Sequence, residues 1–161
     1  MARSFIDKLD ARIIALLQED GRMPYIKIAR ALGVSETTVR TRVQRLVEER
    51  IVQIVAVGDP FKLGFGMVGT FKIQIDPKKV TSVIQALRKI KEIWYIALAT
   101  GSEHIDTEFN TTSLEDLRVL LYEKLNTIDG ILKIDTSILM GYEKRDYTWG
   151  TGMDNDGSRA V

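Results

Sequence analysis

Residues 24–50, PYIKIARALGVSETTVRTRVQRLVEER, contain the pattern that decides the fold of the N-terminal region. Ile28 and Ala29 lie on the buried side of a first helix, and Gly33 ends that helix. Ser35 can cap a second helix by accepting a hydrogen bond from a backbone N–H group. The small Ala29 allows the two helices to approach closely across the short turn. The stretch therefore predicts a helix-turn-helix.

The second helix of this motif has an apolar stripe on one side and a polar face on the other. At about 100° per residue, Val39, Val43 and Leu46 form the stripe. The residues expected to contact base edges in a major groove are Thr37, Thr41 and Gln44. The residues expected to flank them and hold phosphates are Ser35, Thr38, Arg40, Arg42 and Arg45. Arg42 lies nearer the stripe, so we expect it to bond within the motif as well as to phosphate.

The distribution of charge agrees with DNA binding. Residues 22–45 carry six Lys/Arg and one Asp/Glu, a net charge of +5. The whole chain carries 23 Lys/Arg and 22 Asp/Glu, a net charge of +1, so the excess of basic residues is local. A near-neutral protein with one basic face suits a regulator that contacts phosphates locally, and double-stranded DNA is the expected partner. The alternative is a module of the same shape that contacts only proteins.

Composition argues against several other classes of function. The 161 residues suffice for one ordinary domain or two small ones. The chain has no cysteine and one histidine, which argues against a disulfide framework, a cysteine-based metal site and a Ser-His-Asp triad. We therefore expect no catalytic residues, no metal site and no cofactor. No apolar run of membrane length and no signal peptide is evident, so we expect a cytoplasmic protein without a membrane partner.

The remainder of the chain predicts a second domain of a different kind. The β-branched stretch at residues 51–57 is expected to form a linking strand that pairs with a partner. Beyond it, strand and helix patterns follow in the order β-α-β-β-α-β, which defines a ferredoxin-like sheet with both helices on one face. We expect the bare face to be apolar, with Phe71, Ile73 and Leu98 among its residues, and to be covered by a second subunit.

The predicted fold class is therefore α+β, with a helix-turn-helix head joined by a strand linker to a ferredoxin-like βαββαβ domain. The predicted boundaries are 1–50 for the DNA-binding head, 51–64 for the linking strand and hinge, 65–149 for the dimerisation and effector domain, and 150–161 for a flexible tail.

Two motifs and a hairpin make this chain similar to a known family. LDARIIALLQEDGR at residues 9–22, IARALGVSETTVRTRVQRL at 28–46 and the hairpin at Gly101 resemble the Lrp/AsnC transcription factors, also called feast/famine regulators. The resemblance covers about residues 4–145. It implies homodimers formed through the second domain, further assembly into tetramers or octamers, and a small effector, commonly an amino acid, between neighbouring second domains.

The resemblance also implies where such an effector binds. The implied residues are Gly101, Ser102, Glu103, His104 and Thr136. The family pattern at the hairpin resembles Gly-x-x-Asp, whereas this chain has His104 in place of the acid. Backbone N–H groups of Gly101 and Ser102 can hold a carboxylate, but an imidazole does not attract an ammonium group as a carboxylate does. A second interpretation stays open, in which residues 101–104 form only a tight turn and His104 is a surface residue.

Three functions are compatible with these patterns. The leading one is a sequence-specific DNA-binding regulator, dimeric or larger, modulated by a small effector such as an amino acid. The first alternative is an architectural protein that wraps DNA and senses nothing. The second is an enzyme similar to haem-pathway decarboxylases of the same two-domain fold, which gather several basic or histidine residues in the second domain. Residues 1–50 carry ten Lys/Arg and seven Asp/Glu, net +3, which leaves −2 for the rest, so we expect no enzyme.

Overall fold

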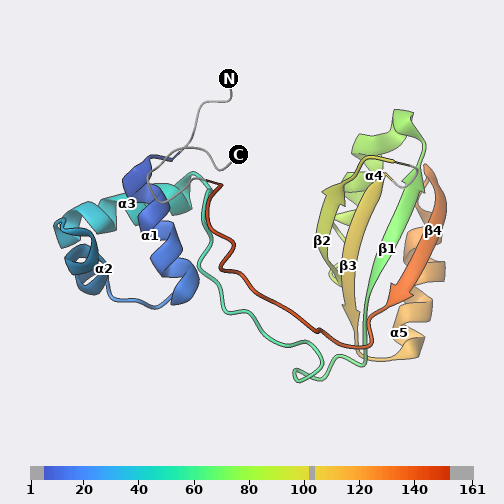
Figure 1. Ribbon diagram of the computed structural model, residues 1–161. Coiled ribbons are helices and arrows are strands. Elements are labelled where there is room, and N and C mark those ends of the chain that lie inside the picture. Colours follow the sequence, from blue (N-terminus) through green and yellow to red (C-terminus); the bar gives the residue numbers. More distant parts are fainter. Residues whose placement is uncertain (1–5, 102–103, 153–161) are drawn as a thin grey trace. The chain divides into compact units, whose positions relative to one another are not determined.

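The computed structural model describes residues 6–101 and 104–152 of the chain (Figure 1). The chain divides into two compact units. One unit, called the head here, comprises Met1–Val57 together with Lys144–Val161, and the other, the sheet domain, comprises Gly58–Glu143. Within the described part of the chain, no helix has both the length and the apolar character that a membrane crossing requires.

The head is built from three helices and a C-terminal segment. The helices are α1 (Lys8–Glu19), α2 (Tyr25–Leu32) and α3 (Glu36–Glu48). Their shared core consists of Ile13, Leu17, Ile28, Ala29, Val39 and Val43. Ala29 is 2% exposed and belongs to this core, as expected for a small residue where two helices cross. Residues 144–149, which the sequence groups with the second domain, group in space with these helices.

Capping side chains explain where two of the helices begin. Ser35 caps α3 as predicted, because its Oγ accepts a hydrogen bond from the backbone N–H of Thr38 at 3.1 Å. Asp7 caps α1, and Asp10 completes a capping box in which each carboxylate accepts a hydrogen bond of 2.9 Å from the other's backbone N–H. The sequence alone favours Ser4 as the cap of this helix, because Ser4 and Asp7 have the spacing of a capping box, but the cap is Asp7, and Ser4 lies outside the described residues.

The end of α3 shows a left-handed residue that is not glycine. Arg50 has φ +57°, its N–H donates to Val47 O at 3.0 Å, and the N–H of Ile51 donates to Leu46 O at 2.9 Å. These two bonds make a Schellman motif, which satisfies carbonyls that the helix leaves open. Residues 51–57 then continue without forming the predicted strand, because no described strand pairs with them.

The sheet domain confirms the predicted ferredoxin-like order. Its strands are β1 (Met67–Ile75), β2 (Ile93–Leu98), β3 (Ile105–Thr111) and β4 (Ile131–Ile138). All pairs are antiparallel, in the order β2-β3-β1-β4. The helices are α4 (Val80–Leu87), which follows a 3-10 turn at Pro77–Lys79, and α5 (Leu114–Val119), which continues into a π turn at Leu120–Lys124 and a 3-10 turn at Leu125–Thr127. Both helices lie on one face of the sheet (Figure 1).

The bare face of the sheet is polar, and the prediction that it is apolar was wrong. Phe71 and Ile73 are fully buried in the core beneath the helices, where Phe71 stacks on Phe109 with ring centroids 4.2 Å apart. The opposite face of β1 carries Lys72. In the strand register, Lys72 lies opposite Asp106 of β3 and opposite Asp135 of β4. Further residues on this face, placed there by the strand register, are Thr70, Gln74, Glu108, Asn110 and Ser137.

Leu98, also predicted on the bare face, pairs with Ile105 and so lies on the helix-covered side. It is nevertheless 64% exposed, because β2 is an edge strand of the sheet.

Candidate nucleic-acid interface

The outward face of α3 carries the side chains that the sequence assigns to base contacts. Thr37, Thr41 and Gln44 are exposed, whereas the stripe of Val39, Val43 and Leu46 is buried in the head. The amphipathic orientation of α3 is therefore as predicted. Short polar groups on an exposed helix face can enter a major groove and form hydrogen bonds with base edges.

The polar residues around this face have partners of their own in the free chain. Ser35 Oγ and Thr38 Oγ1 lie 2.8 Å apart, so both hydroxyls serve the cap of α3. Arg40 is paired with Glu36 at 2.7 Å, and its guanidinium carbon lies 5.3 Å from the centre of the Tyr25 ring.

Gln44 Nε2 donates to Glu48 Oε1 at 2.9 Å. Like the pair of Arg40 with Glu36, this contact is exposed to solvent. Exposed pairs of this kind contribute little to stability, so the side chains can exchange them for phosphates or bases.

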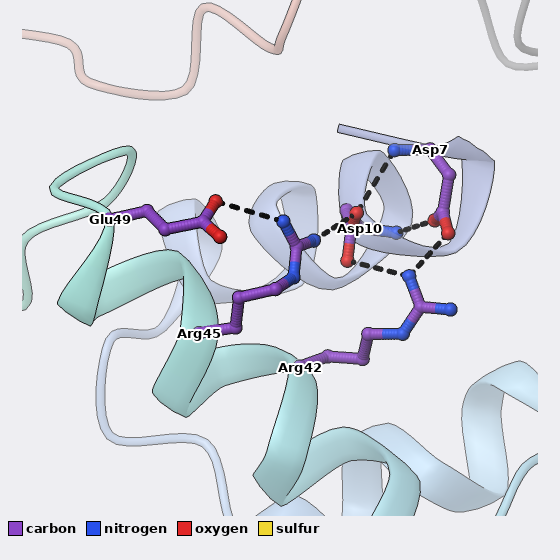
Figure 2. Close-up of polar contacts among 5 residues, drawn as sticks. All are labelled: Asp7, Asp10, Arg42, Arg45 and Glu49. Carbon is purple, nitrogen blue, oxygen red and sulfur yellow. Dashed lines mark hydrogen bonds and ion pairs between the residues drawn. The ribbon is translucent and has the colours of Figure 1, made fainter. Parts of the chain in front are cut away.

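Arg42 and Arg45 differ from Arg40, because they are held by carboxylates of α1 (Figure 2). Arg42 NH1 is bonded to Asp7 and, at 3.1 Å, to Asp10 Oδ1. Arg45 NH2 lies 2.5 Å from Asp10 Oδ2, and its NH1 lies 3.1 Å from Glu49. Arg42 thus bonds within the head, as predicted, and Arg45 shares the same acceptor. Both arginine side chains are about one-third exposed, so each retains a surface toward solvent.

Asp10 is the centre of this cluster and is 1% exposed. Its two carboxylate oxygens accept hydrogen bonds from Arg42, from Arg45 and from the backbone N–H of Asp7. A buried carboxylate requires such partners, because an unpaired charge in a protein interior is strongly unfavourable. Asp10 therefore joins the start of α1 to the middle of α3, and it fixes the position of two arginines on the expected recognition helix.

The same contacts shift pKa values. Burial raises the pKa of the Asp7 carboxyl, but hydrogen bonds from the backbone of Asp10 and from the Arg42 side chain outweigh it, and the pKa lies below its usual value of 3.8. The side-chain hydrogen bond to Asp7 raises the pKa of Arg42. The ionised Asp7 thus stabilises the folded head above pH 3.8, and this contribution is lost as the pH falls through the lowered pKa.

Sequence patterns suggested Asp7 only as the partner of Ser4 in a capping box and did not single out Asp10, although one signal was present. Asp10, Ile13, Ile14 and Leu17 follow each other at spacings i, i+3, i+4 and i+7, so an acid occupies an inward position of an amphipathic helix. An acid there indicates a buried partner of opposite charge.

The hairpin between β2 and β3 is only partly described. Gly101 has φ +112°, and among the described residues no heavy atom lies within 4 Å of the position that a Cβ would take. Ser102 and Glu103 lie outside the described residues. His104 is directed at the end of β1: its Nδ1 lies 3.0 Å from Ile75 O, and its backbone N–H donates to Ile73 O at 3.1 Å.

Thr136 lies away from this hairpin within one chain. It is exposed on β4 and pairs with Phe71 of β1, whereas the hairpin leads into β3. Since β1 separates β3 from β4, the two positions are at least about 10 Å apart across the sheet. One copy of the chain therefore does not bring Thr136 and Gly101 together.

The arrangement of a buried three-helix core, an exposed polar α3 and flanking arginines defines a DNA-binding protein of the helix-turn-helix class. Comparison with known families agrees: residues 6–47 match the AsnC-type helix-turn-helix domain, and residues 70–149 match the Lrp/AsnC ligand binding domain. The chain belongs to the Lrp/AsnC family of transcriptional regulators. It is a DNA-binding regulator with a ligand-binding domain and not an enzyme.

Relatives in archaea cover most of the chain. An uncharacterised HTH-type transcriptional regulator of Pyrococcus furiosus is 39% identical over 143 residues, which cover 88% of this chain and 97% of the relative. The HTH-type transcriptional regulator LrpA of Pyrococcus horikoshii is 32% identical over 136 residues, covering 84% of this chain and 96% of the relative.

Solved structures of bacterial regulators have the same fold. AsnC of Escherichia coli superposes with a TM-score of 0.74 at 26% identity, covering 88% of this chain and 96% of that chain. A transcriptional regulator of Neisseria meningitidis, solved in complex with L-Met, has a TM-score of 0.76 at 20% identity and covers 89% of this chain and 95% of that chain.

Proposed function

We propose that this chain regulates transcription by binding a specific DNA sequence as a homodimer or a larger homo-oligomer, with its DNA binding modulated by a small effector. The observation that carries the proposal is the exposed polar face of α3 on a head whose core and arginines are fixed. Thr37, Thr41 and Gln44 contact base edges, since they are exposed on the face of α3 opposite its buried stripe.

Phosphate contacts come from the side chains that flank this face, namely Ser35, Thr38, Arg40, Arg42 and Arg45. Arg40 is the most available arginine of this set: its side chain is 62% exposed, against 33% for Arg42 and 35% for Arg45. Its pair with Glu36 is solvent-exposed and is readily exchanged for a phosphate. Arg42 and Arg45, held by Asp10, offer their outer N–H groups in a fixed position, which lowers the entropy cost of binding.

Two substitutions on α3 test the DNA assignment. Arg40→Ala is expected to weaken binding to all DNA sequences and to lower the slope of log K against log salt by about one charge. Gln44→Ala is expected to cost about 1–3 kcal/mol at particular base pairs and to leave the salt slope unchanged. Fluorescence anisotropy with DNA selected from a random pool, measured at several salt concentrations, separates the two effects.

Arg118→Ala is the matched control, because Arg118 is an exposed arginine paired with a glutamate in the sheet domain. Wild-type affinity in both α3 variants would exclude α3 as the recognition helix. Equal affinity of the wild type for all sequences would favour the DNA-wrapping alternative.

Self-association of the chain is supported by exposed apolar side chains at both edges of the sheet. Trp94 and Leu98 on β2 are 54% and 64% exposed, and Leu132 on β4 is 64% exposed. Association of copies through either edge would remove these large apolar groups from water. A symmetric dimer also brings two heads to one DNA molecule, which fits a palindromic site.

Effector binding is proposed at the hairpin of Gly101, in a site shared between copies of the chain. The matched ligand-binding domain supports a small ligand such as an amino acid. The residues assigned to this site from the sequence are Gly101, Ser102, Glu103 and His104 of one copy and Thr136 of a neighbouring copy. Backbone N–H groups in the Gly-Ser part of the hairpin can hold a carboxylate. A shared site couples the effector to assembly, because the ligand's contacts exist only when the neighbour is in place.

Calorimetry with a panel of amino acids tests this site. The wild type is expected to bind simple aliphatic amino acids weakly near neutral pH, because His104 stands where a carboxylate is expected. His104→Asp is expected to bind them more tightly, since the new carboxylate can pair with the ammonium group. His104→Asn, which removes the imidazole without adding charge, is the control. Tight binding of leucine by the wild type that is lost in His104→Asp would refute the role assigned to His104.

A further inference from the structure

The C-terminal segment of the chain forms one wall of a groove in the head. The groove has a volume of about 560 Å³ and is walled by α1, by residues 51–57 and by residues 147–151, all within the head. Ile14, Leu17 and Ile54 contribute apolar walls, and Trp149 lines the groove from the C-terminal side. The two chain segments that connect the head with the sheet domain therefore meet at α1.

Gln18 of α1 holds the C-terminal segment by a pair of hydrogen bonds. Its Nε2 donates to Gly150 O at 3.2 Å, and its Oε1 accepts from Gly150 N–H at 3.1 Å. The side-chain amide thus pairs with the Gly150 backbone as a neighbouring β-strand would. Gly150 has φ +77°, a conformation that glycine adopts without strain. It lies one residue beyond the part of the chain that matches the ligand-binding domain.

The segment that leads to Gly150 has local order of its own. Arg145 donates to the Tyr147 hydroxyl at 3.0 Å, and its guanidinium lies 5.9 Å from the centre of the Tyr147 ring. Asp146 accepts from the backbone N–H of Thr148 at 2.9 Å and from its hydroxyl at 2.6 Å. These contacts make a short, shaped segment that presents Gly150 to α1, whereas Trp149 borders the groove and stays 78% exposed.

We propose that residues 144–152 are a strap that ties β4 of the sheet domain to α1 of the head and keeps the head ready to bind DNA. The strap follows β4 closely, because β4 ends at Ile138 and the backbone N–H of Leu139 still donates to Val68 O at 2.8 Å. When the strap is docked on α1, two chain segments restrain the head, namely the one that begins with residues 51–57 and the strap itself. When it is undocked, only the first of them does so. Fewer accessible head positions mean a smaller entropy loss when two heads engage one DNA site.

The strap acts on the same helix that positions the recognition arginines. The C-terminal half of α1 carries Gln18, and its N-terminal turn carries Asp10, which holds Arg42 and Arg45. The strap begins at Lys144, eight residues after Thr136 on β4, and reaches Gly150 fourteen residues after Thr136. A ligand that moves β4 therefore has a short path to the recognition helix. This coupling to DNA rests on the proposed function, whereas docking of the strap does not.

Hydrogen exchange of the Gly150 amide measures docking of the strap without DNA. The full-length protein is labelled with ¹⁵N-glycine, and Gly150→Ala identifies the Gly150 resonance among the twelve glycines. The amide of Gly150 in the wild type is expected to exchange at least about ten times more slowly than an unprotected amide, because its hydrogen bond to Gln18 breaks only when the strap leaves α1. Gln18→Met keeps the length and helix propensity of the side chain but removes both hydrogen bonds, so protection is expected to vanish.

DNA affinity then measures the coupling. Gln18→Met is expected to raise the Kd for selected DNA by about three- to tenfold, the effect of losing one or two hydrogen bonds, with the salt slope and base preference unchanged. Gln53→Met is the matched control, because Gln53 lines the same groove and makes no hydrogen bond to any described residue. An unchanged salt slope separates release of the strap from loss of a phosphate contact.

A second pair of variants acts from the strap side and leaves the helices untouched. Gly150→Ala has room for its Cβ but strains a backbone at φ +77°, so it is expected to reproduce the effect of Gln18→Met on DNA affinity. Gly152→Ala has equal room at φ +66° and no hydrogen bond to a described residue, and it is expected to behave like the wild type.

The outcomes are distinguishable. A wild-type Gly150 amide that exchanges at the rate of an unprotected amide overturns the strap. Loss of protection in Gln18→Met with DNA affinity unchanged overturns the coupling to the head. A wild type that selects no DNA overturns the proposed function, and the exchange measurement then still decides whether the strap is docked.

Discussion

Asp10 is the residue on which the geometry of the head depends most directly. Its carboxylate completes the capping box of α1 and also contacts Arg42 and Arg45 of α3, so one side chain supports both the start of α1 and its packing against α3. Because it is 1% exposed, water cannot replace a partner that is lost. The two arginines are positioned before DNA arrives, in contrast to Arg40, which only has an exposed pair.

Asp10→Asn is expected to lower the free energy of unfolding of the head by about 1–3 kcal/mol. The amide is nearly isosteric, but it loses the negative charge and leaves a buried N–H₂ facing two guanidinium groups. Urea unfolding followed by circular dichroism measures the change. Glu36→Gln, which alters an exposed pair in the same unit, is expected to change stability little. Equal effects of the two substitutions would contradict the central role of Asp10.

Residue patterns predicted the outward face of α3 but not the carboxylates behind it. The orientation of α3 followed from its apolar stripe of Val39, Val43 and Leu46, because burial follows the 3.6-residue period of a helix. The partners of Arg42 and Arg45 are 32 to 35 residues away in sequence, and periodicity carries no information on such pairs. The roles of Gly101, His104 and Thr136 stay predictions, since they depend on a neighbouring copy.

At the scale of elements, the end of α3 contains a strained residue. Arg50 occupies the left-handed position of a Schellman motif at φ +57°, where a side chain with a Cβ is disfavoured. Arg50→Gly is expected to raise the free energy of unfolding by about 1 kcal/mol, because glycine removes that strain. Thermal or urea unfolding measures the gain.

Arg50→Ala is the control for this substitution. It removes the same charge and the same long side chain but keeps the Cβ, so no comparable gain is expected. If alanine and glycine stabilised the head equally, the backbone conformation would not be the cause.

Elements with strong periodicity were predicted well, the face to which the apolar side chains of β1 belong was not, and the pairing of residues 51–57 with a partner stays a prediction. The order of strands and helices in the sheet domain follows from alternating patterns at β1 and at the helices after it. The apolar set of β1, however, was assigned to the wrong face, although the helices require it for their core. Residues 51–57 have the composition of a strand, but a strand also needs a partner, and this chain supplies none among its described strands.

At the scale of the whole molecule, oligomeric state is the property to measure first. Light scattering at micromolar concentration is expected to give a dimer, a tetramer or an octamer. The same state is expected to persist in about 0.5 M salt, where exposed charges are strongly screened. Apolar side chains such as Trp94 and Leu132 lose water on association, and salt does not weaken that effect. A monomer at low salt would exclude a dimeric regulator. Dissociation by salt alone would assign the interface to the charged face around Lys72.

The bond between Gln18 and Gly150 also fixes an order of events during synthesis. The two residues are separated by 132 positions, with the entire sheet domain between them. At typical rates of translation, Gly150 leaves the ribosome about 7 to 26 s after Gln18, long after three small helices can form. A nascent chain can therefore fold the head and expose α3 before the strap has been synthesised. The strap can dock on α1 only after translation has passed β4.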